Sequence, residues 1–290
     1  MRVAVIGGNG QLGSDVVRVF RERGDDVRAL THGDIELDNP GSIANCLKSA
    51  APDVVVNTAA MHHVEQCEQQ PEKAFAVNAI GVRNLALTTK EIGATLIHVS
   101  TDYVFDGEKG QPYVEDDAPL PLNVYGNSKL SGEHFVRTLN DKHFVLRVSA
   151  IYGTQPCRAK GGRNFVELML KLGRERGTVR VVNSEVVSPT PTVQIAAQIY
   201  ELSRCDQYGL YHGTAEGSCS WYDFAREIFK AAGMNVDVQV AGPNEFPAKV
   251  PRPKYSVLEN QGLKRLGINR FTEWQDGLQQ YLNQTAAVAS

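Results

Sequence analysis

A tyrosine and a lysine four residues apart are the first candidates for chemistry in this sequence. Tyr125 and Lys129 fall in a helical pattern over residues 125–139, and residues i and i+4 share one face of a helix. A phenol with a pKa of about 10 is a poor proton shuttle at pH 7, but a nearby ammonium stabilises its phenolate. The pair therefore suits reduction of a carbonyl group, in which the phenol protonates the nascent alkoxide.

Support for this pair comes from Thr101, because the same spacing also occurs by chance on exposed helices. Thr101 follows Ser100 directly after an apolar run at 95–99 that predicts a buried strand. In a doubly wound sheet the carboxyl ends of the strands line the ligand crevice. We predict Thr101, Tyr125 and Lys129 as the catalytic residues, with Thr101 donating a hydrogen bond to the same carbonyl oxygen.

A glycine-rich turn lies between the first predicted strand, at 3–6, and the first predicted helix. Its spacing is G-x-x-G-x-x-G. Such a turn lets the backbone approach a pyrophosphate, and the helix N-terminus offers unpaired N–H groups. Glycine spacing alone would fit any tight strand–helix turn, but this strand–turn–helix context favours a dinucleotide site. Its predicted members are Gly7, Asn9, Gly10, Gln11, Leu12 and Gly13.

The end of the second predicted strand bears on which dinucleotide is bound. The segment Leu30-Thr31-His32-Gly33 has no acid at the position that usually holds the ribose 2′-hydroxyl. Thr31 and His32, close to Arg28, would tolerate a 2′-phosphate. We therefore expect NADP(H) as the cofactor and leave NAD(H) open.

Apolar runs alternate with helical patterns through the first half of the chain. Continuous Val/Ile-rich strands of this kind predict a parallel sheet covered on both faces, an α/β doubly wound, Rossmann-like fold with a smaller C-terminal substrate lobe. We place a dinucleotide-binding domain at residues 1–152 and a mostly substrate-binding lobe at 153–290. Segments near 164–176 and 209–214 are expected to return to the first domain.

Composition excludes several other classes of protein. The formal charge of −3 gives no electrostatic reason to bind nucleic acid or an anionic membrane. Five scattered cysteines without a C-x-x-C pair argue against a disulfide scaffold, and the adjacent His62 and His63 lack a third metal ligand. No run approaches the roughly 20 apolar residues of a membrane span. We expect a soluble cytoplasmic protein without a metal, a nucleic acid or a membrane partner.

Taken together, these motifs resemble the dTDP-4-dehydrorhamnose reductase group of the extended short-chain dehydrogenase/reductases. The resemblance covers nearly the whole chain and rests on the glycine turn, on Thr101 before Asp102–Gly107, on Tyr125-x-x-x-Lys129 and on Arg252–Leu258. It implies an NAD(P)H-dependent reductase of a nucleotide-linked 4-keto-6-deoxyhexose in dTDP-rhamnose biosynthesis. It also implies that Thr101, Tyr125 and Lys129 carry the catalysis.

The same resemblance implies further contacts at the two ends of the site. It places Glu36 and Leu37 against the adenine and Ala59 and Ala60 along the cofactor cleft. The remaining predicted cofactor contacts are Thr31, Asn78, Ser100, Tyr125 and Lys129. The residues predicted to face the sugar nucleotide are Met61, His62, Thr101, Ala150, Asn164, Phe165 and Arg252.

The substrate-facing positions depart from the pattern of the group. Many members have a tryptophan where Ala150 stands, and their Asp-Gln-x-Gly-x-Pro-Thr run is Ser184–Thr190 here. An indole buries on the order of 200 Å² against a ligand, so we expect a changed sugar preference unless Met61 or His62 fills the space. The basic loop with Arg158, Lys160 and Arg163 either contacts the diphosphate or is solvated.

A non-catalytic role is the alternative. Proteins of this fold include a regulatory subunit of methionine adenosyltransferase, so a regulatory NADP-binding protein is the second hypothesis. The intact trio of Thr101, Tyr125 and Lys129 argues against it, because a regulator has no need for an aligned acid. A homodimer is left open by the sequence.

Overall fold

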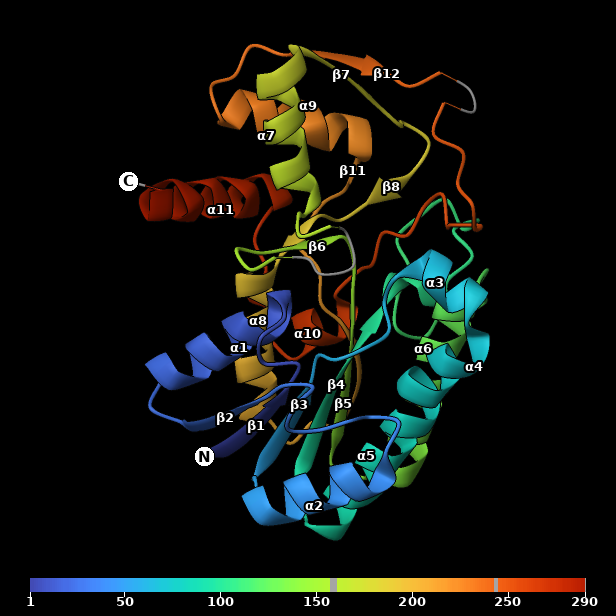
Figure 1. The fold of residues 1–290 in the computed structure, drawn as a ribbon, viewed down its shortest axis with the longest axis vertical. Coiled ribbons are helices and arrows are strands. Elements are labelled where there is room, and N and C mark those ends of the chain that lie inside the picture. The colour runs from blue at the N-terminus through green and yellow to red at the C-terminus, as the bar shows by residue number, and fades with distance from the viewer. Residues whose placement is uncertain (157–160, 243–244, 290) are drawn as a thin grey trace.

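A six-stranded parallel sheet forms the lower half of the molecule (Figure 1). The computed structural model describes residues 1–156, 161–242 and 245–289. The strand order is β10-β5-β4-β3-β1-β2, and every pairing is parallel. The predicted doubly wound α/β fold is confirmed. The strands are β1 (Arg2–Ile6), β2 (Asp26–Leu30), β3 (Val54–Asn57), β4 (Thr95–Thr101), β5 (His143–Val148) and β10 (Gly209–His212).

Alternate side chains of each strand pack into two different helical layers. On β1, Val3 and Val5 belong to a core shared with α1 (Gln11–Glu22) and α8 (Thr192–Ser203). Ala4 and Ile6 belong to the core on the other face, formed with α2 (Pro40–Ala50), α5 (Val82–Glu91) and α6 (Val124–Leu139). Because successive strand residues point to opposite faces, both faces are buried, which explains the continuous apolar runs in the sequence.

The chain turns tightly from β1 into α1. Gly7 has a φ of 77°, and the N–H groups of Gly7 and Gly8 donate to the carbonyl of Leu30 at 2.9 and 3.1 Å. A Cβ on Gly13 would lie 2.1 Å from the carbonyl oxygen of Gly7. Glycine is therefore required at position 13 for α1 to begin this close to the strand.

The pattern at 71–92 predicts one helix, but the structure interrupts it with a π-helical segment. The chain passes through α3 (Val64–Gln69), α4 (Pro71–Phe75) and the π-helix η1 (Ala76–Gly81) before α5. Within η1, Gly81 packs so closely on the carbonyl of Leu37 that a Cβ would lie 2.4 Å away. The widened turn is invisible to a 3.6-residue pattern, and such segments are frequent at functional sites.

A smaller lobe surrounds its own core in the upper half of Figure 1. Asn164 forms a capping box with Glu167 at the first of its helices, and Ser220 caps the second. No helix in the described ranges is long and apolar enough to cross a membrane. The elements of this half are β6 (Ile151–Tyr152), α7 (Phe165–Arg176), β7 (Thr178–Val181), β8 (Val186–Val187), β9 (Thr190–Pro191), β11 (Cys219–Ser220), α9 (Trp221–Ala231), β12 (Asp237–Val240) and α11 (Trp274–Ala289). The short helix α10 (Gln261–Arg265) instead packs against β10 of the sheet, and its Leu263 belongs to the core shared with α1 and α8.

Segments from the second half of the chain complete the sheet lobe. The strand β10 pairs with β5, and α8 packs against α1, where Thr192 donates to Asp15 at 2.6 Å. The expected return of residues 164–176 is not found. Instead α7 packs on α9 and β7, because its apolar residues Val166 and Met169 belong to the core of the smaller lobe.

Candidate active site

A cavity of about 1020 Å³ opens where the parallel strands end. Both lobes contribute to its walls. The three residues that the sequence predicts as catalytic, Thr101, Tyr125 and Lys129, all line it. Of the residues that the sequence predicts for the site, those on the cavity wall are Gly7, Asn9, Gly10, Gln11, Leu12, Gly13, Thr31, Glu36, Leu37, Ala59, Ala60, Met61, His62, Ser100, Thr101, Tyr125, Lys129, Ala150, Asn164, Phe165 and Arg252. Asn78 is the predicted residue that the wall lacks.

The glycine turn forms the dinucleotide end of this cavity. Gly10 precedes α1 without any side-chain hydrogen bond to the helix, so the first turn keeps unpaired N–H groups and its partial positive charge. Gln11 bridges the lobes, because its amide donates to the carbonyls of Gly153 and Gln155 at 3.3 and 3.2 Å. A close backbone cradle with an uncapped helix start fits a pyrophosphate.

Carboxylates do lie near the end of β2, although the sequence has none at the strand tip itself. The backbone N–H and the hydroxyl of Thr31 both donate to Asp34 at 2.8 Å, and these bonds lower the pKa of that carboxyl. His32 Nδ1 lies 3.0 Å from Glu36 Oε1. Both side chains contact carboxylates in this structure, and a 2′-phosphate held by Thr31 and His32 stays a prediction.

The helix α6, which carries Tyr125 and Lys129, is fixed at its first turn. Asn123 accepts from the N–H of Gly126 at 2.9 Å and donates to the carbonyl of Pro251 at 2.9 Å. A Cβ on Gly126 would lie 2.2 Å from the carbonyl oxygen of Tyr103 in the short 3₁₀-helix η2 (Asp102–Val104). This close packing places Tyr125 against the end of β4, with its ring centre 5.6 Å from that of Tyr103.

The pKa of Tyr125 shifts in the direction opposite to the one that the sequence predicts. Burial raises the pKa of Tyr125, and a hydrogen bond with Thr101 opposes that rise. Burial also lowers the pKa of Lys129 to about 8. The lysine Nζ donates to the carbonyl of Val99 at 2.7 Å and lies 3.3 Å from His98 Nε2. Desolvation of the phenol outweighs stabilisation of its phenolate, so Tyr125 is held as a protonated proton donor.

Buried polar groups that sequence reasoning missed support Thr101 and α6. Asp102 accepts hydrogen bonds from Thr101, Ser149 and Ser256 at 3.1, 2.9 and 2.6 Å. Burial raises the pKa of the Asp102 carboxyl. This carboxyl joins the end of β4 to two distant loops, and its position directly after the predicted Thr101 was the available signal.

A second network anchors α6 further along the helix. Glu133 of α6 accepts from Arg147 Nη2 of β5 at 2.7 Å and from the Ser100 hydroxyl at 2.5 Å. Both charged side chains are 1% exposed. Ser100 is predicted to contact the cofactor, but in this structure its hydroxyl donates a hydrogen bond to Glu133 within the protein.

Asn78 joins two segments that line the cavity, although it does not line the cavity itself. Its Oδ1 accepts from the N–H of Met61, and its Nδ2 donates to the Met61 carbonyl and to the Ser128 hydroxyl, at 2.9, 2.9 and 3.0 Å. These bonds hold the segment after β3 against α6. The Asn78 side chain is used in these internal hydrogen bonds rather than presented to a cofactor.

Aromatic rings form the wall contributed by the smaller lobe. Phe165 lies 4.7 Å from Trp221 and 5.6 Å from Phe224, measured between ring centres. The indole N–H of Trp221 donates to Glu185 at 3.1 Å. Asn164 also lines the cavity, but its amide nitrogen donates to Gly153 and Tyr281 and its oxygen accepts from Glu167. The polar atoms of the Asn164 side chain are therefore already bonded within the protein, which argues against the predicted substrate contact.

Arg252 is the charged group best placed to meet an anionic substrate. Its Nη2 donates to Glu65 at 2.8 Å, while its Nε is buried and has no partner among the described residues. Arg163 of the basic loop is exposed. Arg158 and Lys160 lie outside the described residues.

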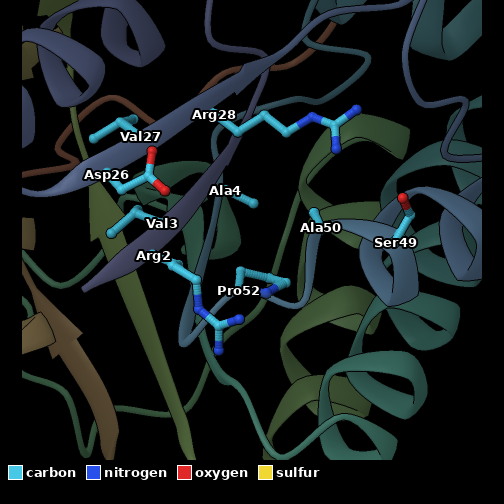
Figure 2. A pocket seen from close by; sticks show the side chains of 9 residues that line it. All are labelled: Arg2, Val3, Ala4, Asp26, Val27, Arg28, Ser49, Ala50 and Pro52. Carbon is cyan, nitrogen blue, oxygen red and sulfur yellow. The ribbon is translucent and has the colours of Figure 1, made fainter.

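A second hollow, of about 410 Å³, lies at the opposite end of the strands. Figure 2 shows the side chains of Arg2 and Arg28 extending from it in different directions. Arg2 is paired with Asp53 at 2.9 Å. None of the predicted site residues lines this hollow, and ligands of such sheets bind at the carboxyl ends of the strands.

Comparison with known proteins identifies the family. Residues 1–287 match the family described as RmlD substrate binding domain. The chain belongs to this family. The spore coat polysaccharide biosynthesis protein SpsK of Bacillus subtilis is 38% identical, over 99% of this chain and 98% of that protein. A dTDP-4-keto-6-deoxy-D-glucose reductase of Streptomyces niveus is 34% identical, over 96% of each chain.

A solved structure agrees with the RmlD assignment. The dTDP-4-dehydrorhamnose reductase of Bacillus anthracis, in complex with NADP, superimposes with a TM-score of 0.92 at 35% identity, covering 98% of this chain and 99% of that one. The family predicted from the motifs is confirmed.

Proposed function

We propose that this RmlD-family protein is an NADPH-dependent reductase of a nucleotide-linked 4-keto-6-deoxyhexose, a dTDP-4-dehydrorhamnose reductase or a close variant. The observation that carries the proposal is one cavity lined by the glycine turn, Thr101, Tyr125 and Lys129. Family membership over residues 1–287 supports the same reaction. Bound NADPH would supply a hydride to the carbonyl carbon.

The side chains of this chain would move and hold the proton. The protonated phenol of Tyr125 donates to the developing alkoxide, which converts the ketone into an alcohol. Thr101 orients the phenol through their shared hydrogen bond. Lys129, buried one turn further along α6, would be the next proton source.

The glycine turn and its neighbours would hold the cofactor. The N–H groups at the start of α1 suit the pyrophosphate, and Glu36, Leu37, Ala59 and Ala60 line the path toward the adenosine and the nicotinamide. NADP bound to the Bacillus anthracis relative supports NADPH here. Asp34 and Glu36 place carboxylates near the end of β2, and a carboxylate there can hold the ribose 2′-hydroxyl of NADH. NADH is therefore the second cofactor in the proposal.

The substrate end is assigned to the smaller lobe. Arg252 lines the cavity and would contact the diphosphate through its guanidinium group, and Phe165 with Trp221 would pack on the nucleoside or sugar. Met61, His62 and Ala150 would face the sugar. The relatives act on more than one 4-keto sugar by name, which agrees with a specificity set at these positions.

The decisive experiment is NADPH oxidation with dTDP-4-keto-6-deoxy sugars, using the wild type and Tyr125→Phe. Loss of the proton donor should lower kcat by about 100-fold or more, while the Kd for NADPH stays unchanged in calorimetry. Near-normal turnover by the variant would contradict the mechanism. NADPH binding by the wild type without turnover of any 4-keto sugar would favour the regulatory alternative.

We also propose a cytoplasmic location, because the cysteines of the described residues, Cys46, Cys67, Cys205 and Cys219, are unpaired thiols. The homodimer stays a prediction.

A further inference from the structure

Behind the catalytic residues lies a buried row of three side chains from three elements. Asn57 ends β3, His98 lies within β4, and Lys129 lies on α6; their exposed fractions are 0, 0 and 2%. Asn57 Nδ2 is 3.1 Å from His98 Nδ1, and His98 Nε2 is 3.3 Å from Lys129 Nζ. His98 does not line the cavity, so the proposed reaction gives it no direct contact with a ligand.

The donors and acceptors in this row fix the tautomer of His98. Asn57 Oδ1 accepts from the N–H of Ala59 at 3.1 Å, and this bond turns the amide so that Nδ2 faces the imidazole. An amide nitrogen only donates, so His98 Nδ1 must accept. A neutral imidazole then carries its proton on Nε2. Rotating the amide of Asn57 by half a turn would set its Nδ2 against the N–H of Ala59.

This tautomer presents a hydrogen-bond donor to Lys129. The uncharged amine has a lone pair that can accept from His98 Nε2–H, whereas the ammonium has none. Burial also lowers the pKa of His98 well below its usual value, so the imidazole stays neutral beside Lys129. The row therefore has matched donors and acceptors only when Lys129 is uncharged.

The other ionisable groups around Lys129 leave this preference in place. Glu133, one turn further along α6, favours the ammonium, but its carboxylate is bonded to Arg147 of β5 and to Ser100 of β4. Tyr125, one turn earlier, is an uncharged phenol because burial raises its pKa. Burial is the largest influence on Lys129 and lowers its pKa to about 8.

We propose that His98, oriented by Asn57, is a positioning residue that favours the uncharged amine of Lys129 and so drives return of a proton to Tyr125 after each reduction. The inference rests on the proposed reductase function. Tyr125 Oη first gives its proton to the substrate oxygen. The ammonium of Lys129 then gives one proton to the phenolate, His98 Nε2–H donates to the resulting amine, and a solvent proton finally returns to Nζ.

The tautomer can be measured directly by ¹⁵N NMR on the full, cofactor-free chain with labelled histidine. The chain has 7 histidines, and the signals of His98 are those lost in His98→Gln. We expect the neutral Nε2–H tautomer across neutral pH, without titration to the imidazolium. An Nδ1–H tautomer or an imidazolium at His98 would overturn the proposal, and this measurement requires neither a substrate nor a folded variant at Asn57.

Asn57→Asp should exchange the donor and acceptor roles of the two ring nitrogens of His98. A carboxylate accepts from Nδ1–H, which leaves Nε2 free to accept from the Lys129 ammonium. We expect the His98 tautomer to switch and the basic limb of the kcat–pH profile to move upward by about one unit. Asn140→Asp is the matched control, because Asn140 is 2% exposed and its amide donates to Thr89, away from Lys129.

The outcomes separate this inference from the proposed function. A switched tautomer with an unmoved basic limb, or an equal shift in the Asn140→Asp control, would overturn the role of His98. Absence of turnover with every 4-keto sugar would overturn the reductase function while the tautomer measured in the wild type stands. A variant at Asn57 that fails to fold leaves the wild-type NMR result to decide.

Discussion

The two walls of the cavity are built in different ways. The wall on the sheet side joins the ends of β1, β3 and β4 to the first turn of α6, and close backbone contacts such as Gly13 on Gly7 fix it. The opposite wall depends on side-chain pairs: Trp221 with Glu185 in the smaller lobe, and Arg252 with Glu65 of α3. The proposed chemistry therefore rests on backbone geometry, whereas the choice of substrate rests on replaceable side chains.

The largest effect is expected on the sheet side, from Gly13→Ala. The new methyl group would meet the Gly7 carbonyl at 2.1 Å, so the turn must move, and a displacement of about 1 Å can cost on the order of 100-fold in binding or rate. Calorimetry with NADPH measures the loss. Gly33→Ala is the control, because its Cβ would lie an ordinary 3.8 Å from Thr31 Oγ1. Equal weakening by both variants would contradict a specific role for the turn.

An intermediate effect is expected on the other wall, from Arg252→Met. Hydrogen bonds to charged groups contribute about 1.5–3 kcal/mol, or roughly 10- to 100-fold. We expect KM for the sugar nucleotide to rise by that factor while the Kd for NADPH is unchanged, because Arg252 lies on the substrate wall. Arg83→Met, at an exposed site on α5, is the control. A rise in the Kd for NADPH instead would move Arg252 to the cofactor end.

The smallest effect is expected from Ala150→Trp, which probes the sugar. Ala150 lines the cavity with a φ of 45°, and an indole there would narrow the pocket. We expect the ratio of kcat/KM between 4-keto epimers to change by about 10-fold, since each small apolar contact contributes 1–3 kcal/mol to discrimination. If the wild type already strongly prefers dTDP-4-dehydrorhamnose over its epimers, the altered-preference hypothesis is wrong.

The same contrast explains what the sequence could predict. The glycine turn, Thr101 and the Tyr125-Lys129 pair are recognisable because each motif is contiguous and lies at a strand end. Asp102, Glu133 and His98 each act through at least one partner more than 30 residues away, Ser149, Ser100 and Lys129 respectively. Spacing along the chain does not reveal such contacts.

Local sequence patterns gave a wrong or incomplete prediction in two places, the end of β2 and the helix at 164–176. Asp34 follows the end of β2 by a few residues and folds back onto Thr31, so a search limited to the strand tip missed it. The periodicity of the 164–176 helix shows an apolar face but does not show which core receives it, and the receiving core includes Phe224 and Phe229 of α9.

The late arrival of β10 has a consequence for how the protein is made. The edge strand Gly209–His212 and the covering helix α8 are needed to bury β5 and α1, yet they are synthesised after the first segment of the smaller lobe, β6 to β9. A nascent chain ending near residue 152 exposes Phe144 and Leu146 at an unpaired sheet edge. Completion of the sheet lobe must therefore wait until His212 has left the ribosome, which makes partly synthesised chains natural clients for chaperones.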